Sequence, residues 1–362
     1  MQRSCYKQQF CYKHVADQPV YLDVYPPAVV PSSGDARFPA VVYFHGGGLT
    51  VGSRTSWFPE WLQTRLANTG IVFVSVAYRL LPPATLHEIL DDVRDAMGFL
   101  AKDDLQCADE SGKRFGIDVD AIGTAGTSAG GTLAYLAAIH AVPRPRAVLG
   151  MYAMFGNAFS PLILAPKTEI FTRGRELLDP AAFSEFLYPA STSLPILTES
   201  ALAYHPPDSA TPGWPANPRM PLSRLYFQLG TFLDYITGQH EPSVSEALRP
   251  LLDEDDLLVR QEAVRAVLPR EHHALFPQLN VTPGFPPTFL VHGSEDTGVP
   301  LDESRHFKRL LEEVGVKVEL RVVDGAEHSF DYVSDAEERY GALFDEVAEF
   351  FKGALAGAKT RR

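Results

Sequence analysis

Five short, almost continuously apolar runs constrain the fold of this chain more than any other feature. Runs of this kind are typical of parallel strands that are buried on both faces of a sheet. Segments with the helical period separate them, among them 86–102, 129–140 and 302–314. This alternation predicts an α/β protein with a mostly parallel central sheet flanked by helices. The five runs are AVVYF (40–44), IVFVSVA (71–77), DAIGTAG (120–126), AVLGMY (147–152) and TFLVHG (288–293).

Three further segments belong at the borders of this sheet. Residues 5–15 and 19–26 form a leading pair that is typical of a β-hairpin. The segment VKVELRVV (316–323) alternates strictly between apolar and polar residues, which predicts an edge strand with one face in water.

The long stretch from 153 to 285 breaks the strand–helix rhythm. It carries eight prolines between Pro189 and Pro221, which argues against regular strands there. We expect two helices in it, one over 222–236 and one that starts after the acidic residues 253–256. The stretch is therefore interpreted as a mainly helical inserted cap or lid. The predicted division is a first core part (1–152), the lid (153–285) and a second core part (286–362).

Composition excludes several classes of partner. The formal charge of −13 argues against nucleic acid and against an electrostatic membrane anchor. The start MQRSCYKQQF has no apolar core of a signal peptide, and no apolar run approaches the roughly 20 residues of a membrane span. The three cysteines (Cys5, Cys11 and Cys107) lack CxxC spacing, so neither a disulfide framework nor a metal site is expected. We expect a cytoplasmic protein without a cofactor, and a homo-oligomer stays open.

Ser128 lies in the segment Gly126-Thr127-Ser128-Ala129-Gly130, which matches the pattern G-x-S-x-G. A strand is expected before it and a helix after it, and in this context the pattern forms a sharp turn that exposes a nucleophilic serine. Larger side chains at 126 and 130 would collide with neighbouring backbone. The N–H of Ala129, at the helix N-terminus, would then serve as an oxyanion donor.

Two other interpretations of the serine segment fail. A phosphate-binding P-loop needs a lysine after its last glycine, but Gly131 is followed by Thr132. A flexible joint would not lie between an apolar strand and a helix rich in alanine and leucine. Ser128 is therefore predicted to be a nucleophile.

A glycine-rich loop, His45-Gly46-Gly47-Gly48, follows the first core run. Its glycine spacing also fits a dinucleotide-binding turn, which would require an acidic residue after the next strand. Tyr78-Arg79 stands there instead; this fits NAD poorly, although an arginine suits NADP. In the other interpretation, the N–H groups of Gly46 and Gly47 help to hold an oxyanion. The serine turn favours the oxyanion interpretation.

A serine nucleophile needs a base, and the base needs an orienting acid. In sheets of this class the chain order is serine, acid, histidine. Two acids follow the strand TFLVHG, and we favour Asp296 over Glu295 because the loop then turns through Gly298 and Pro300. Glu295 is expected to face solvent.

Of the eleven histidines, His328 is the one with the right order and place, in a loop after the last strand. His272 and His273 are adjacent, so they would point to different faces of a helix and make neither a base nor a zinc pair. His292 belongs to a strand and is interpreted as buried structure. Ser128, Asp296 and His328 all follow strand ends, where ligands bind in such sheets.

Together these motifs resemble the hormone-sensitive-lipase-type branch of the α/β-hydrolase superfamily, in its GTSAGG subgroup. The resemblance covers about 38–152 and 286–352. It implies an α/β-hydrolase fold and esterase activity, with Ser128, Asp296 and His328 as triad and Gly46, Gly47 and Ala129 as oxyanion donors. Two features depart from the family: Leu81-Pro82-Pro83 replaces the usual alanine-proline-glutamate, and the insertion is unusually long. The motifs are His45-Gly46-Gly47-Gly48, Tyr78-Arg79-Leu80, the serine segment through Gly131, Gly293 to Pro300 and Gly325 to Phe330.

Three functions follow from these residues. The first is a serine hydrolase that cleaves a carboxylic ester of a relatively apolar small molecule through an acyl-enzyme. The second is an acyltransferase, or a lyase or cyclase acting on carbon–carbon bonds in secondary metabolism, with the same triad; the unusual insertion motivates it. The third is a non-catalytic ligand receptor on this scaffold, which the complete triad disfavours.

An aromatic stripe in the predicted lid helix offers a wall for an apolar substrate group. The same stripe is also explained as plain lid core, which the sequence favours slightly over a substrate wall. Its residues are Tyr226, Phe227, Phe232 and Tyr235.

Overall fold

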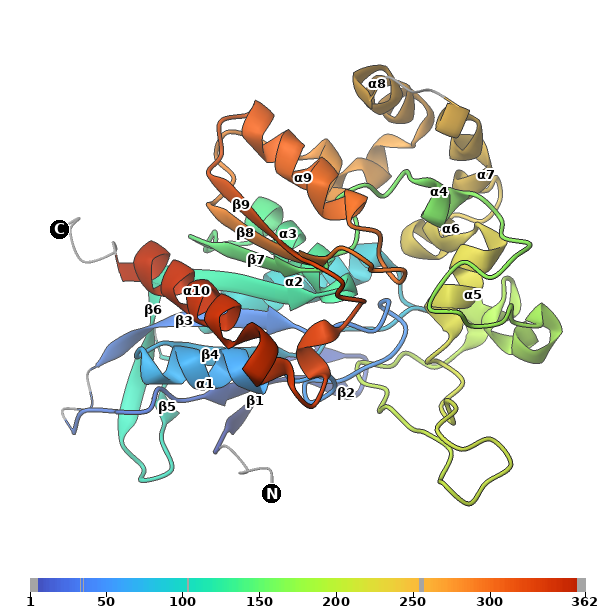
Figure 1. Cartoon of the computed structure of the whole chain (residues 1–362). Helices are drawn as coiled ribbons and strands as arrows, with labels where there is room; N and C mark the ends of the chain where they lie inside the picture. The colour runs from blue at the N-terminus through green and yellow to red at the C-terminus, as the bar shows by residue number, and fades with distance from the viewer. Residues whose placement is uncertain (1–5, 33, 35, 103, 254–256, 357–362) are drawn as a thin grey trace.

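The computed structural model describes residues 6–32, 34, 36–102, 104–253 and 257–356 (Figure 1). Cys5 and residues 254–256, named above, lie outside these ranges. The strand order is β1-β2-β4-β3-β6-β7-β8-β9, and the short β5 pairs with β6 outside this path. The strands are β1 (Gln8–Val15), β2 (Gln18–Tyr25), β3 (Arg37–Phe44), β4 (Val72–Val76), β5 (Cys107–Ala108), β6 (Arg114–Thr127), β7 (Val148–Met151), β8 (Thr288–Gly293) and β9 (Val318–Val323).

The prediction of a mostly parallel sheet is confirmed. Every neighbouring pair from β4 to β9 is parallel, whereas β1 pairs antiparallel with β2, and β2 with β4. The register sets Ala40 of β3 between Val72 of β4 and Ile122 of β6. The alternating segment forms β9 at the edge of the sheet, as predicted.

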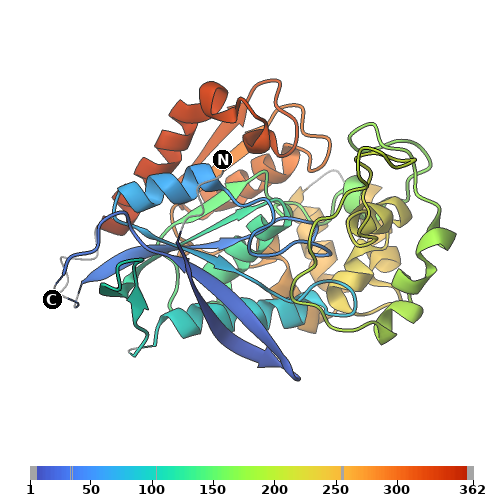
Figure 2. The same cartoon turned by 90° about the horizontal axis from the view of Figure 1, so that it is seen from below.

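Helices cover both faces of the sheet, as Figures 1 and 2 show. α1 and α10 pack together on one face, where Trp61 stacks on Phe344 with ring centroids 4.1 Å apart. α2, α3 and α9 lie on the other face. The helices are α1 (Glu60–Asn68), α2 (Leu86–Leu100), α3 (Ala129–His140), α4 (Pro161–Leu164), α5 (Leu222–Leu229), α6 (Phe232–Thr237), α7 (Val244–Leu248), α8 (Leu257–Val267), α9 (Asp302–Glu313) and α10 (Ala336–Ala356).

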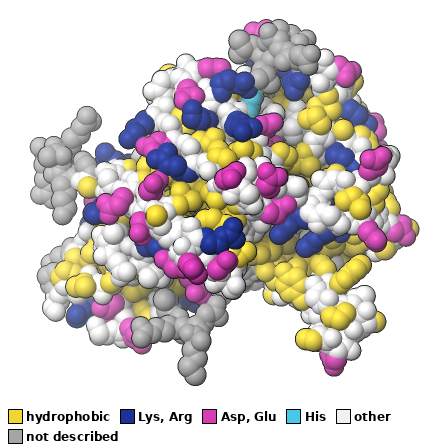
Figure 3. Space-filling view, viewed as in Figure 1, with side chains coloured by type: hydrophobic (Ala, Val, Ile, Leu, Met, Phe, Trp, Pro, Cys, Tyr) yellow, Lys and Arg dark blue, Asp and Glu magenta, His cyan; other side chains and the backbone are white. Residues whose placement is uncertain are grey.

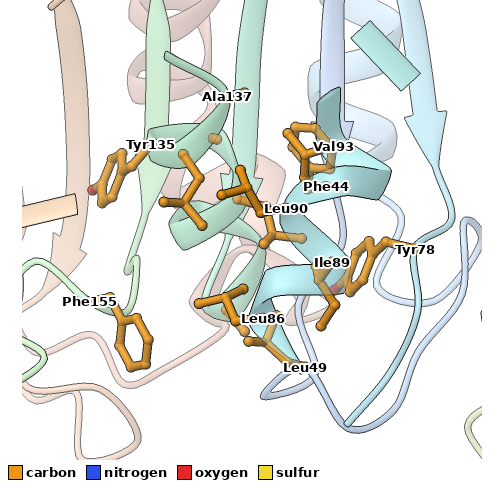
Figure 4. Packing of buried hydrophobic residues seen from close by; sticks show 14 of the residues in the cluster. Phe44, Leu49, Tyr78, Leu86, Ile89, Leu90, Val93, Tyr135, Ala137 and Phe155 are labelled. Carbon is orange, nitrogen blue, oxygen red and sulfur yellow. The ribbon is translucent and has the colours of Figure 1, made fainter. Parts of the chain in front are cut away.

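Residues along β3 alternate between two buried clusters. Phe44 faces α2 and α3 and packs in the cluster that includes Ile89 and Leu90 (Figure 4). Tyr43 faces the opposite side and belongs to the cluster under α1 and α10. Because both faces of the strand are buried over residues 40–44, this part of β3 is continuously apolar rather than alternating.

Residues between β7 and β8 leave the sheet and form the inserted segment, which contains α4 to α8 and several 3₁₀ turns (Figure 2). In its proline-rich part, residues 194–221 form no helix or strand and make only isolated bridges. No helix in the described ranges is both long and apolar enough to cross a bilayer.

The single helix predicted over 222–236 is wrong, because the structure has two helices there, α5 and α6. Gly230 ends α5 in the left-handed conformation, with φ of 64°. A Cβ atom at this position would lie 2.7 Å from the carbonyl oxygen of Leu164. Glycine therefore allows both the reversal of the chain and its close approach to α4.

Candidate active site

Ser128 lies at the turn between β6 and α3, with a φ of 53°. Its backbone N–H donates to the carbonyl oxygen of Met151 at 2.9 Å, which ties the turn to the neighbouring strand β7. A Cβ atom on Gly126 would overlap the Gly130 carbonyl, and one on Gly130 would overlap the carbonyl of Phe44. The small residues around Ser128 are thus required by close backbone packing, as the sequence predicts.

Three sequence-predicted residues meet at the carboxyl ends of the strands. The Nε2 atom of His328 lies 3.1 Å from the Oγ atom of Ser128. On the other side of the imidazole, Nδ1 lies 2.8 Å from Oδ2 of Asp296. Asp296 follows β8 and His328 follows β9. Because these strands are parallel, the two loops lie close together at the carboxyl ends of the strands. Glu295, the rejected alternative, is exposed.

The carboxylate of Asp296 is buried, and both of its oxygens accept hydrogen bonds. Its Oδ1 accepts the backbone N–H groups of Gly298 at 2.9 Å and Val299 at 2.8 Å. Burial alone would raise the pKa of Asp296, but contacts with His292 and His328 hold the pKa well below its usual range. Asp296 is therefore ionised at neutral pH and fixes the tautomer of His328, with the proton on Nδ1.

His292, interpreted from sequence as a structural residue, is buried beside Asp296. Its Nε2 lies 2.7 Å from the carbonyl oxygen of Val299 and 3.3 Å from Oδ2 of Asp296, while the hydroxyl of Ser304 lies 2.8 Å from Nδ1. Because carbonyl and carboxylate oxygens only accept, Nε2 carries a proton, and Nδ1 forms a hydrogen bond with the Ser304 hydroxyl. His292 thus supports the loop that carries Asp296.

The loop His45-Gly46-Gly47-Gly48 lies beside the serine turn. A Cβ atom on Gly46 would lie 3.3 Å from the Cβ of Ser128, so this backbone passes directly next to the predicted nucleophile. His45 is buried and stacks on Tyr78 with ring centroids 4.4 Å apart, and the Tyr78 hydroxyl donates to the carbonyl of His45 at 2.7 Å. Burial lowers the pKa of His45 to about 4, so the ring is neutral near pH 7.

Arg79, the residue that left a dinucleotide interpretation open, is paired with an acidic residue of the protein instead. Its guanidinium contacts both carboxylate oxygens of buried Asp92 at 2.8–3.1 Å. The backbone N–H of Arg79 donates to the same carboxylate at 2.9 Å. Arg79 therefore anchors the strand end to α2 and has no free charge for a ribose phosphate.

A cavity of about 420 Å³ opens above Ser128. The glycine loop, the loops after the strands and the inserted segment all contribute to its wall. Of the four aromatic residues predicted as a substrate wall, Phe227 alone lines this cavity among the described residues. The lining includes Gly46, Gly47, Trp57, Ser128, Tyr152, Met154, Tyr204, Met220, Phe227, Val299, His328 and Tyr332.

The other three aromatic residues lie in the packing of the inserted segment. Tyr226 and Tyr235 stack on each other with ring centroids 3.8 Å apart, and the Tyr226 hydroxyl donates to the carbonyl of Phe186. Phe232 packs against Phe155 and Phe227. The geometry at these three positions favours the interpretation that the stripe belongs to the core of the inserted segment.

Tyr152 is a site residue that the sequence reasoning missed. Its ring meets the His328 ring edge to face at 4.6 Å, and its hydroxyl donates to buried Asp331 at 2.6 Å. Trp61 donates to the same carboxylate at 3.1 Å. A signal existed, because Tyr152 directly follows β7, and residues at that end of the sheet face the site.

Three arginines of the inserted segment also line the cavity and were not foreseen. They are Arg173, Arg175 and Arg224. No motif or periodicity marks them, and their proximity depends on how the inserted segment folds back over the sheet.

Family models match two parts of the chain. A model described as alpha/beta hydrolase fold matches residues 41–183, and a prolyl oligopeptidase family model matches residues 269–358. The first match includes the glycine loop and the serine turn, and the second includes the loops of Asp296 and His328.

The curated relatives include polyketide synthases much longer than this chain and a probable carboxylesterase. The chain is 30% identical over 349 residues to the non-reducing polyketide synthase ausA of Aspergillus calidoustus. The aligned region covers 92% of this chain but 13% of that protein. It is 32% identical over 150 residues to the probable carboxylesterase M8 of a Phoma species, covering 41% of this chain and 47% of that protein. The chain thus spans only about an eighth of the length of the polyketide synthase.

Solved structures support the same fold. Esterase 2 of Thermogutta terrifontis with bound propionate superposes with a TM-score of 0.56 at 18% identity, covering 98% of this chain and 96% of that one. This likeness concerns the fold alone. With the sheet order, the serine turn and the family matches, it leads to one conclusion: the chain has the alpha/beta hydrolase fold.

Proposed function

We propose that this protein is a serine hydrolase that cleaves a carboxylic ester of a small molecule through an acyl-enzyme intermediate. The observation that carries the proposal is the chain of contacts from Asp296 through His328 to Ser128. The esterase-like fold and the carboxylesterase relative support it.

Acylation begins at Ser128. With the Nδ1 proton of His328 directed at Asp296, the Nε2 atom is free to accept the hydroxyl proton as Oγ attacks the ester carbonyl. The carbonyl oxygen becomes negatively charged in the tetrahedral intermediate. Backbone N–H groups of Gly46, Gly47 and Ala129 are the proposed donors to that oxygen, and each such donor contributes about 10²–10³ in turnover.

The leaving alcohol then takes the proton from Nε2 of His328, and the acyl group stays on Ser128. Water enters the same position, His328 removes its proton, and the attack on the acyl-enzyme releases the acid. The ionised carboxylate of Asp296 stabilises the imidazolium that forms twice in each cycle. The inserted segment acts in this proposal as the lid that shapes the cavity.

The cavity is large enough for a small molecule, because pockets for such ligands usually measure about 300–1,000 Å³. Trp57, Phe227 and Met154 offer apolar contacts in its wall. We therefore infer a substrate whose acyl or alcohol part is partly apolar.

A labelling experiment tests the proposal directly. A fluorophosphonate probe should label the purified protein at Ser128, and the Ser128→Ala variant should be neither labelled nor active. A p-nitrophenyl ester series from acetate to palmitate then reports activity and usable chain length together. A folded wild-type protein without labelling or turnover would refute the hydrolase and favour a ligand receptor.

A second candidate keeps the triad and changes the acceptor. Seven of the matched relatives are named as non-reducing polyketide synthases and cover 88–96% of this chain, which favours an acyl substrate from secondary metabolism. An acyl group on Ser128 would then pass to an alcohol or to a carbon nucleophile of the substrate. Mass analysis of products from polyketide esters decides between them: free acid plus alcohol alone supports hydrolysis, and a transferred or cyclised product supports this alternative.

A further inference from the structure

The cavity above Ser128 has an unusual charge distribution for this chain. The whole protein carries a formal charge of −13, yet three arginines line the cavity and no Asp or Glu does so among the described residues. The three are Arg173, Arg175 and Arg224, all from the inserted segment. A local excess of positive charge in an acidic protein is a feature that a binding site for an anion would explain.

None of the three arginines forms an ion pair with an acid within the described ranges, unlike Arg54, Arg65 and Arg79. Arg224 is half-buried, and one of its terminal nitrogens donates to the backbone carbonyl of Glu176 at 2.7 Å. Burial, followed by the nearby charge of Arg175, lowers the pKa of Arg224. The two like charges therefore repel each other at the cavity wall without a counter-charge.

The loop that carries two of these arginines is fixed to the candidate active site. The backbone N–H of Arg173 donates to the hydroxyl of Thr297 at 2.9 Å, and Thr297 directly follows Asp296. The N–H of Arg175 donates to the carbonyl of Thr172 at 3.0 Å and closes a turn. Both arginine side chains are exposed, so the turn holds two positive charges at the mouth of the cavity.

The first turn of α5 completes this positive wall. Ser223 and Arg224 of that turn line the cavity, and the N-terminal turn of a helix adds partial positive charge. On the face drawn in Figure 3, Lys and Arg side chains lie beside hydrophobic surface near the loop that projects from the inserted segment. The cavity thus combines apolar contacts with cationic groups.

We propose that the substrate carries an anionic group, a carboxylate or a phosphate, which Arg224 binds with help from Arg173 and Arg175. The inference rests on the proposed hydrolase function and narrows its substrate class to charged esters or thioesters. Guanidinium groups suit this role because they present several N–H donors to carboxylate or phosphate oxygens. The anion would supply the missing counter-charge and orient the scissile carbonyl over Ser128.

Matched substrate pairs test the inference. For a carboxylate on the acyl side, p-nitrophenyl hydrogen suberate is compared with its neutral methyl ester. For a phosphate on the leaving group, butyryl 4′-phosphopantetheine is compared with butyryl pantetheine. We expect kcat/KM to be at least about ten-fold higher for the anionic member of one pair, which identifies the source of the charge, and this preference should shrink with added salt.

Arginine variants connect the preference to the cavity. Arg224→Gln should lower the ratio of kcat/KM for the anionic member to kcat/KM for the neutral member about ten-fold or more. Arg173→Gln and Arg175→Gln, which alter exposed side chains, should each lower it a few-fold. Arg94→Gln, on the surface of α2, serves as the matched control and should leave the preference unchanged.

The outcomes separate this inference from the proposed function. Hydrolysis of neutral esters without any preference in either pair would overturn the anionic substrate and leave the hydrolase standing. If no ester is turned over and Ser128 is not labelled, the hydrolase fails. Calorimetric binding of p-nitrophenyl hydrogen suberate and of butyryl 4′-phosphopantetheine to Ser128→Ala then tests the anion site independently of turnover. Binding that Arg224→Gln abolishes would support the site, and binding that is absent or insensitive to the arginines would refute it.

Discussion

The Nε2 atom of His328 lies 3.1 Å from the hydroxyl oxygen of Ser128, although 200 positions separate the two residues in the chain. The contact exists because β6 and β9 are parallel strands of one sheet. The loops that follow these strands therefore lie at the same end of the sheet, at the carboxyl ends of the strands. The backbone turn at Ser128 and the anchoring of His328 by Asp296 fix both partners before a substrate arrives. We therefore expect the activity to depend sharply on each of the three residues.

The Asp296→Asn variant tests the orienting acid. Asparagine removes the negative charge that stabilises the imidazolium and can present its amide to Nδ1, which favours the wrong tautomer of His328. We expect kcat for an ester to fall by about 10⁴. Circular dichroism should show retained secondary structure. The neighbouring Glu295→Gln variant removes an exposed charge and should keep near wild-type kcat; an equal loss in both variants would contradict the assignment of Asp296.

The Gly130→Ala variant tests the packing of the serine turn. A methyl group there would overlap the carbonyl oxygen of Phe44, and neither backbone can move freely. We expect the free energy of unfolding in urea to fall by about 3 kcal/mol or more. Gly98 in α2 has no atom within 4 Å of an added Cβ, so Gly98→Ala should instead stabilise by about 0.5–1 kcal/mol. Equal effects of both substitutions would show that the turn is not tightly packed.

The Tyr152→Phe variant separates support from catalysis. It keeps the ring against His328 but removes the hydroxyl that donates to buried Asp331. The carboxylate then retains Trp61 as a side-chain donor, and we expect a loss of about 1–3 kcal/mol in the free energy of unfolding. Because the hydroxyl does not contact Ser128 or His328, kcat should fall less than ten-fold. A loss of kcat near that of Asp296→Asn would give Tyr152 a direct role instead.

The sheet and the candidate triad could be predicted because each rests on a local pattern. Continuous apolar runs such as 40–44 reflect burial on both faces, and glycines beside Ser128 reflect one crowded turn. The order of serine, acid and histidine then selects Asp296 and His328 from many candidates. Their catalytic roles stay predictions until the variants are measured.

The cavity wall could not be predicted, because it depends on long-range packing within the inserted segment. Tyr226 and Phe227 are adjacent on one apolar helix, yet Phe227 lines the cavity and Tyr226 stacks inside the segment. Adjacent side chains on a helix point about 100° apart, and which of the two faces the cavity depends on how α5 packs in the inserted segment. Arg175 and Arg224 meet at the wall from positions 49 residues apart, and no sequence spacing relates them.

The buried His45 predicts a pH dependence of stability. Burial lowers its pKa from 6.5 to about 4. Between these two pH values, His45 is therefore neutral in the folded protein and protonated in the unfolded chain. The unfolded state therefore binds more protons between these two values, and the free energy of unfolding falls as the pH drops from about 6.5 to about 4. The expected loss from this one group is on the order of 3 kcal/mol. Urea unfolding at pH 7 and at pH 4.5 measures it.

The His45→Asn variant isolates this contribution from other histidines that titrate in the same range, such as buried His306. Asparagine can still donate to the Gly46 carbonyl, which lies 2.7 Å from Nδ1 of His45, but it binds no proton. The variant should lose less stability than the wild type on acidification, even if it is less stable at pH 7. Exposed His14 provides the control, and His14→Asn should keep the wild-type slope. Identical slopes for His45→Asn and the wild type would show that His45 is not the group that resists protonation.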